Sequence, residues 1–138
     1  MIDKEKIWKF IKKQNVSFIA SVDEDGFPNM KAMLKPRKID GNKVYFTTNT
    51  SSIRTGQYKN NDKASIYFYN KGKIKYEGVM LLGNMKVLTD DAIKREIWRL
   101  GDSMFYRKGV TDPDYCVLEF TAFSGRYYCD LKTESFDV

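Results

Sequence analysis

Residues 29–54 read N-M-K-A-M-L-K-P-R-K-I-D-G-N-K-V-Y-F-T-T-N-T-S-S-I-R, and this stretch predicts the centre of the fold. A strand with spaced cations reaches Asp40-Gly41, which is a strong β-hairpin signal. The chain returns as a second strand and ends in a hydroxyl-rich corner at residues 47–52, which opens a short helix carrying Arg54. Because phosphates bind cations, hydroxyl groups and free helix N–H groups, the stretch predicts an anion site.

Apolar residues alternate with a period of two on both sides of this hairpin, which predicts a mainly β chain. We expect six or seven short antiparallel strands, joined mostly by hairpins. The expected strands cover residues 16–22, 28–39, 44–48, 64–69, 74–88, 115–123 and 126–131. Pro36 should bend the second strand or place it at a sheet edge, and Gly78 and Gly83 should form bends or bulges.

Three helices are expected among the strands. Asp3 can cap the first, which runs to about Gln14, and the second begins at the hydroxyl-rich corner. Thr89 can cap the third, with Leu100 in its apolar stripe and Gly101 at its end. Helices covering the openings of a small antiparallel barrel, closed or half-closed, would bury the strand edges. We therefore predict a mainly β barrel with two or three covering helices, in a single domain over residues 1–138.

Charge is distributed unevenly along the chain, whose net charge is +6. Residues 31–75 hold eleven Lys and Arg against two Asp, whereas residues 110–138 hold six acidic and two basic side chains. A basic middle and an acidic tail indicate an anionic ligand, or two copies that dock head to tail. The alternative is a basic face that is simply solvated.

The chain has no histidine and only two cysteines, Cys116 and Cys129. This composition excludes catalysis by histidine, haem held by histidine and the common zinc sites, so no metal site is predicted. Cys116 alternates with Leu118 and Phe120 and is expected in the core. No signal-peptide pattern and no apolar run near the roughly 20 residues of a membrane span occur, so we expect a cytoplasmic protein with reduced thiols and no membrane contact.

Several motifs together resemble one known family. They are Lys31-Ala32-Met33-Leu34, Phe46-Thr47-Thr48 followed by Ser52 and Arg54, Gly125-Arg126-Tyr127-Tyr128, and the closing residues 132–136. Their order and spacing resemble the pyridoxamine 5′-phosphate oxidase-like family of FMN-binding split β-barrels, in its short, general-stress-protein-like branch. That family commonly has a threonine, a serine four residues later and a basic residue six residues later, a spacing that Thr48, Ser52 and Arg54 keep.

The resemblance implies a split antiparallel barrel that binds FMN at the interface of a homodimer. The implied cofactor-binding residues are Lys31, Ala32, Met33, Thr47, Thr48, Ser52, Arg54, Arg126 and Tyr128. Lys31, Ser52 and Arg54 would hold the phosphate, the main chain of residues 32–33 would face the polar edge of the flavin, and the two tail residues would close over its ring. The local alternatives are that the hydroxyls only cap a helix, that Arg54 is solvated, and that the tail residues only belong to a sheet.

The implied function is an oxidoreductase that transfers hydride or electrons between bound flavin and an unidentified small molecule, with a nicotinamide nucleotide among the candidates. No catalytic side chain is assigned, because the flavin itself carries this chemistry. The chain lacks the C-terminal Arg-x-His motif of pyridoxamine phosphate oxidases proper, which argues against that reaction. The alternatives are a non-catalytic flavin sensor or carrier, a deazaflavin-binding reductase, and a barrel that binds single-stranded nucleic acid, which the acidic tail opposes.

Overall fold

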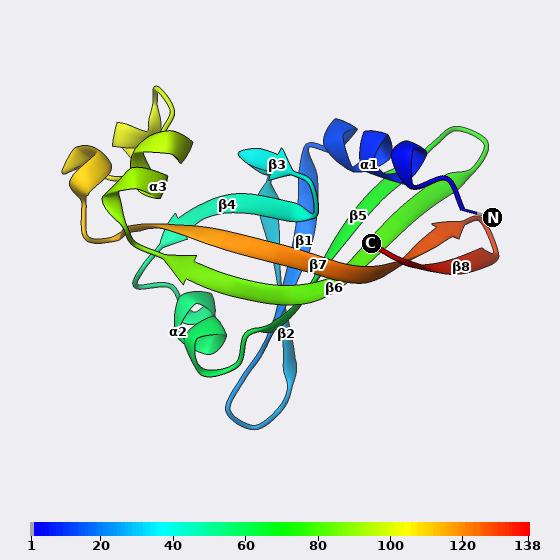
Figure 1. Ribbon diagram of the computed structural model, residues 1–138, viewed down its shortest axis with the longest axis horizontal. Helices are drawn as coiled ribbons and strands as arrows, with labels where there is room; N and C mark the ends of the chain where they lie inside the picture. The colour runs from blue at the N-terminus through cyan, green and yellow to red at the C-terminus, as the bar shows by residue number, and fades with distance from the viewer. Residues whose placement is uncertain (1) are drawn as a thin grey trace.

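A computed structural model describes residues 2–138 as one curled antiparallel sheet surrounded by helices (Figure 1). The helices are α1 (Lys4–Lys13), α2 (Ile53–Asn60) and α3 (Asp91–Ile97). The strands are β1 (Val16–Val22), β2 (Pro28–Leu34), β3 (Lys38–Asp40), β4 (Lys43–Asn49), β5 (Lys63–Lys71), β6 (Tyr76–Leu88), β7 (Tyr115–Cys129) and β8 (Lys132–Asp137). None of the helices in the described part of the chain is long and apolar enough to cross a membrane.

The sheet runs in the order β2-β1-β5-β6-β7-β4-β3, with β8 added to the far half of β7. Because β2 and β3 stand at the two ends of this order, the sheet curls without closing on itself. An unclosed antiparallel sheet with covering helices is the split β-barrel that the sequence predicts, so the predicted fold class is confirmed. The Asp40-Gly41 hairpin also forms, and it joins β3 to β4.

The longest strand, β7, connects two parts of the barrel. Its residues 115–121 pair with β4, and its residues 124–129 pair with β8, while its other edge pairs with β6. The register between β6 and β7 shifts at Gly83, where the Thr121 backbone and the Phe120 ring leave no room for a Cβ atom. The irregularity predicted at Gly83 is therefore confirmed, and it has a packing reason. At Gly78 the pairing with β5 and β7 continues in register, so no bulge forms there.

Helix α1 contributes to the main core through Ile7 and Ile11, which are buried against the inner face of the sheet. Its N-terminus is capped as predicted, because the Asp3 carboxylate accepts hydrogen bonds from the N–H groups of Glu5 and Lys6. A second apolar cluster lies beside α3 and includes Ile97, Tyr106, Tyr115 and Val117. This second cluster fixes the segment that follows α3, at one end of the barrel (Figure 1).

The strand predicted over residues 28–39 is wrong as a single element. It breaks into β2 and β3, which stand at opposite ends of the sheet. The break occurs at Pro36, which has no N–H group for a ladder, and the next residue, Arg37, donates its N–H to the Tyr45 carbonyl instead. The opening of the barrel arises at this break.

The predicted limits of the third helix are also wrong. Asp90 rather than Thr89 caps α3, and the helix ends at Ile97 instead of reaching Gly101. Leu100 is fully exposed and belongs to no apolar stripe. The chain turns away because the Asp102 carboxylate accepts the N–H group of Arg99 at 2.8 Å, and two short 3₁₀ turns follow at Asp102–Met104 and Gly109–Thr111.

The end of the chain differs from its prediction as well. The strands expected at residues 115–123 and 126–131 are one continuous strand, β7, and an additional strand, β8, follows it. Asp130 makes the tight turn between them with a positive φ of 53°. Strand β6 begins at Tyr76 rather than at residue 74.

One face of the sheet has its apolar residues on the outside. In β1, Ser17 and Ser21 point into the barrel and are buried, whereas Val16 and Phe18 point outward and are exposed. Register places Ala32, Phe18, Tyr67, Met80 and Arg126 in one row across five strands on this outer face. The sheet therefore presents a broad apolar surface that no element of residues 2–138 covers.

Candidate functional site

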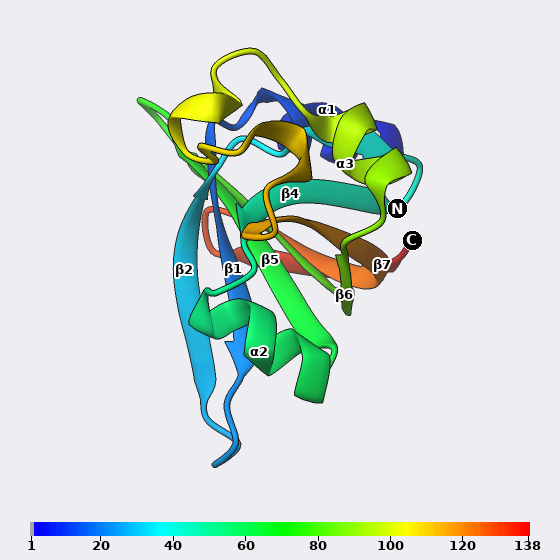
Figure 2. The same cartoon turned by 90° about the vertical axis from the view of Figure 1, so that its left-hand side faces the viewer.

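The candidate site is a hollow in the opening of the barrel, between the edge strand β2 and strand β4. Figure 2 shows these two strands, with α2 below β4 and beside the lower half of β2. The hollow has a volume of about 390 Å³. Of the residues predicted from the sequence, those that line it are Lys31, Ala32, Met33, Thr47, Thr48 and Arg54. The predicted motif on β2 and the predicted motif at the end of β4 therefore lie together, although β2 and β4 are far apart in the order of the sheet.

Arg54 is the central cation of this hollow. It lies in the first turn of α2, and its Nη2 donates a hydrogen bond of 2.9 Å to Thr48 Oγ1. Thr48 is itself buried and cannot offer the guanidinium a counter-charge. The Arg54 Nε–H group is buried without a hydrogen-bond partner. Because an unpaired buried donor is costly, this N–H group fits an acceptor oxygen supplied by a ligand.

Ser52 does not line the hollow but caps α2. Its hydroxyl oxygen accepts the Thr55 N–H group and lies 2.8 Å from the Thr55 hydroxyl. The neighbouring Ser51 N–H donates to the Asp114 carboxylate at 2.8 Å. Hydrogen bonds from Ser51 and Asn49 hold the pKa of Asp114 below its ordinary value, so this carboxylate is charged. The Thr55 N–H group, one of the helix N–H groups that could have bound a phosphate, is therefore already used by Ser52.

Strand β2 offers backbone groups to the hollow. It is the last strand on its side of the sheet, so one of its two edges has no strand partner among residues 2–138. Ala32 and Met33 lie in the middle of this edge strand and line the hollow. Free N–H and C=O groups along such an edge can bind the polar rim of a planar ligand.

Arg126 and Tyr128 lie elsewhere in the same chain. Arg126 is in the same register row as Ala32 but four strands away, which is about 19 Å along the sheet at the usual strand spacing. Tyr128 packs edge-on against Tyr67, with 6.1 Å between ring centroids. Both residues are on the uncovered apolar face, and a single chain does not bring them to the hollow.

The lining also includes residues outside the predicted cofactor set, namely Leu34, Lys35, Asn49, Arg37, Phe46, Phe105 and Tyr106. The last two come from the segment after α3, which has no periodicity that could have pointed to a site. Arg37 ties this segment down, because its Nη1 and Nη2 donate to the two Asp102 oxygens at 2.8 and 2.7 Å. The Arg37 hydrogen bonds lower the pKa of Asp102 and keep it ionised.

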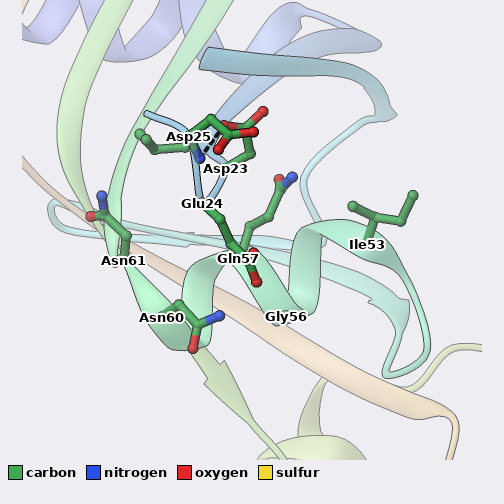
Figure 3. A pocket seen from close by; sticks show the side chains of 9 residues that line it. Asp23, Glu24, Asp25, Ile53, Gly56, Gln57, Asn60 and Asn61 are labelled. Atoms are coloured by element: carbon green, nitrogen blue, oxygen red, sulfur yellow. Dashed lines mark hydrogen bonds between the residues drawn. The ribbon is translucent and has the colours of Figure 1, made fainter. Parts of the chain in front are cut away.

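A larger hollow of about 600 Å³ lies between the turn after β1 and α2 (Figure 3). The turn residues Asp23, Glu24 and Asp25 face Gln57 and the end of α2 across it. Asp23 serves the turn, since it accepts the N–H groups of Asp25 and Phe27. Among residues 2–138, no three acidic or cysteine side chains are placed to share a metal ion. The acidic lining repels phosphate, so the smaller, basic hollow is the better anion site.

Cys116 lies behind the hollow, on β7, and is fully buried as predicted. Its Sγ donates to the Thr48 carbonyl at 3.6 Å. Burial raises the pKa of the Cys116 thiol, so the thiol is neutral and packs as a small apolar group.

The sequence profile described as pyridoxamine 5′-phosphate oxidase matches residues 3–129 of the chain. The chain belongs to this family. A protein related to general stress protein 26 from Clostridium acetobutylicum, of the pyridoxinephosphate oxidase family, is 35% identical, with a TM-score of 0.85 over 99% of this chain and 97% of that one. The family resemblance seen in the sequence is therefore confirmed. None of the curated proteins searched matches the chain.

More distant structures share the fold of the family. General stress protein 26 from Bacillus anthracis str. Sterne is 18% identical, with a TM-score of 0.78 over 98% of both chains. A heme binding protein from Mycobacterium smegmatis is 12% identical, with a TM-score of 0.74 over 99% of this chain and 60% of that one. The same barrel thus occurs in proteins of different description, one of them a heme binding protein, so the fold alone does not identify a ligand.

Proposed function

We propose that this family member binds FMN in the hollow between β2 and β4 and works as a flavin-dependent oxidoreductase on a small molecule. The observation that carries the proposal is the buried Arg54 Nε–H group, which lacks a partner beside the Thr48 hydroxyl. Arg54 and Lys31 would bind the phosphate, and the β2 edge at residues 32–33 would face the flavin ring. Bound flavin would supply hydride or electron transfer, while the protein positions it and excludes water.

Flavin fits the lining better than heme does. The chain has no histidine, which is a common axial ligand of heme iron. The polar lining instead includes the guanidinium groups of Arg37 and Arg54, the ammonium groups of Lys31 and Lys35, and the hydroxyls of Thr47 and Thr48. This donor set matches a phosphate monoester and the polar edge of a planar ring.

A titration of the purified protein with FMN tests the proposal. We expect the visible absorption bands of FMN to shift, and its fluorescence to change, with a dissociation constant in the micromolar range or tighter. Absence of any spectral change at micromolar FMN would remove the proposal. A protein that binds FMN but neither oxidises a nicotinamide nucleotide nor passes electrons to an acceptor would instead be a flavin carrier or sensor.

We further propose that two copies pair through the uncovered apolar face, so that each hollow is completed by its partner. The face carries Phe18 and Leu34 beside the hollow and Tyr69 farther across, and these side chains are 38%, 77% and 41% exposed. A two-fold axis would bring the Arg126 and Tyr128 side chains of one copy toward the β2 edge of the other. This pairing accounts for two predicted cofactor residues that one chain leaves remote.

Replacing Phe18 with aspartate should convert a dimer into a monomer and weaken FMN binding, because a charge would be buried in the apolar contact. Analytical ultracentrifugation of the wild type and the variant measures the change. Leu100→Asp is the matched control, since Leu100 is fully exposed and lies outside the sheet. A wild-type protein that stays monomeric while it binds FMN tightly would contradict the shared site.

A further inference from the structure

A second basic hollow, of about 350 Å³, lies next to the proposed flavin site. It runs between the C-terminal end of α1 and the connection from β2 to β3. Its apolar lining comes from Ile11, Pro36 and Ile39, and no acidic residue lines it. We call it the basic groove, because all its other lining residues are Lys or Arg.

Three cations of the basic groove are available to a ligand. Among residues 2–138, Lys12, Lys35 and Arg99 form no ion pair with a carboxylate. The other two cations are already paired, Arg37 with Asp102 and Lys38 with Glu96. The groove therefore concentrates positive charge that the protein itself does not neutralise.

The Arg99 side chain is held in place before any ligand arrives. Its Nη2 donates to the Arg37 carbonyl at 2.6 Å, and its backbone N–H donates to Asp102 at 2.8 Å. A guanidinium fixed at one end keeps its remaining N–H groups oriented, and ordering it again for a ligand costs little entropy. Arg99 thus differs from a freely moving surface cation.

The basic groove and the hollow between β2 and β4 are continuous in their lining. Lys35 and Arg37 line both. A molecule that enters the hollow beside β2 can therefore extend its far end along these residues toward Lys12 and Arg99. A single ligand can occupy both sites only if its charged group lies away from its reacting part.

We propose that the basic groove binds the anionic end, a phosphate or carboxylate, of the small molecule that reacts at the flavin site. This inference rests on the proposed function, because it gives that reaction an organic anion as its substrate class. Each exposed charge contributes little alone, so recognition needs the three cations together. Binding in the groove should also weaken as salt is raised.

Binding of pyrophosphate and of malonate, measured by calorimetry at low salt, tests the groove without any redox reaction. One of these two anions should bind the wild type more tightly. We expect the double variant Lys12→Glu/Arg99→Gln to bind that anion at least about fivefold more weakly than the wild type does. Lys63→Glu with Lys86→Gln changes the net charge equally at two residues of β5 and β6 that do not line the groove, and it should bind as the wild type does. Tighter pyrophosphate indicates a phosphate ligand, and tighter malonate a carboxylate ligand.

Arg54→Ala separates the basic groove from the flavin site. We expect this variant to keep the anion binding that the groove variant loses, whereas the groove variant keeps its FMN binding. The proposal would be overturned if the double variant and the single variant Lys12→Glu both bound the anion as tightly as the wild type. It would also be overturned if Arg54→Ala lost all anion binding. A chain that binds the anion in the groove but never binds FMN would overturn the flavin function, and with it the assignment of the anion to a flavin substrate.

Discussion

Replacing Arg54 with alanine is expected to weaken FMN binding by roughly 10- to 100-fold, because a charge-assisted hydrogen bond contributes about 1.5–3 kcal/mol. Riboflavin, which has the same ring but no phosphate, should bind the variant almost as it binds the wild type. The comparison therefore assigns the Arg54 guanidinium to the phosphate rather than to the ring. Fluorescence titration with both ligands measures the two dissociation constants.

Lys59→Ala is the matched control for this experiment. Lys59 is an exposed cation in the last turn of the same helix and does not line the hollow. It should leave both affinities unchanged, since only the net charge is altered. If Arg54→Ala weakened the binding of FMN and of riboflavin equally, the phosphate would have to bind in another part of the hollow. Ser52→Ala, by contrast, should act on the stability of α2, because that hydroxyl caps the helix.

Replacing Asp102 with asparagine should lower the free energy of unfolding by about 3 kcal/mol, because it leaves Arg37 without its charged partner in a mostly buried place. The side chains of Arg37 and Asp102 are only 18% and 5% exposed. The lost contacts tie the β2–β3 connection to the segment that carries Phe105 and Tyr106. Urea unfolding followed by circular dichroism measures the difference.

The effect should depend on pH in a defined direction. Arg37 lowers the folded-state pKa of Asp102 below its ordinary value of 3.8. The carboxylate therefore stabilises the fold fully above that ordinary value, and this contribution is lost as the pH falls through the lowered pKa. The stability gap between wild type and Asp102→Asn should be largest near neutral pH and narrow in acid.

The exposed pair of Lys38 and Glu96 provides the contrast, with side chains that are 39% and 53% exposed. Glu96→Gln should change the free energy of unfolding by less than about 1 kcal/mol, since solvent screens this pair. If Asp102→Asn were as mild as Glu96→Gln, the Arg37–Asp102 pair would not fix the segment after α3.

Local sequence signals were sufficient where the structure is built from neighbours. The Asp40-Gly41 turn, the Asp3 and Ser52 caps and the bulge at Gly83 all depend on a few adjacent residues or on one missing side chain. The Arg54–Thr48 contact was accessible for the same reason, because a strand leads directly into a helix there. These features predicted the centre of both the fold and the candidate site.

The features that the sequence did not predict depend on contacts between residues that are far apart in the chain. The early end of α3 depends on Asp102, whose partner Arg37 is 65 residues away. Strand β8 was missed because it is polar and pairs only with β7, with Phe136 as its one buried residue. Phe105 and Tyr106 reach the hollow from a segment without periodicity, and the remoteness of Arg126 follows from register across several strands.

The buried Cys116 gives this protein a chemical reporter of its own. Its neutral thiol lies behind Thr48 and close to Thr50 and Thr55, so a thiol reagent reaches it only when the structure around it opens. Cys129, which is partly exposed, reacts without such an opening and serves as the internal reference for the same sample. The ratio of the two labelling rates therefore measures how often the structure at the back of the hollow opens, and no additional cysteine has to be engineered into the chain.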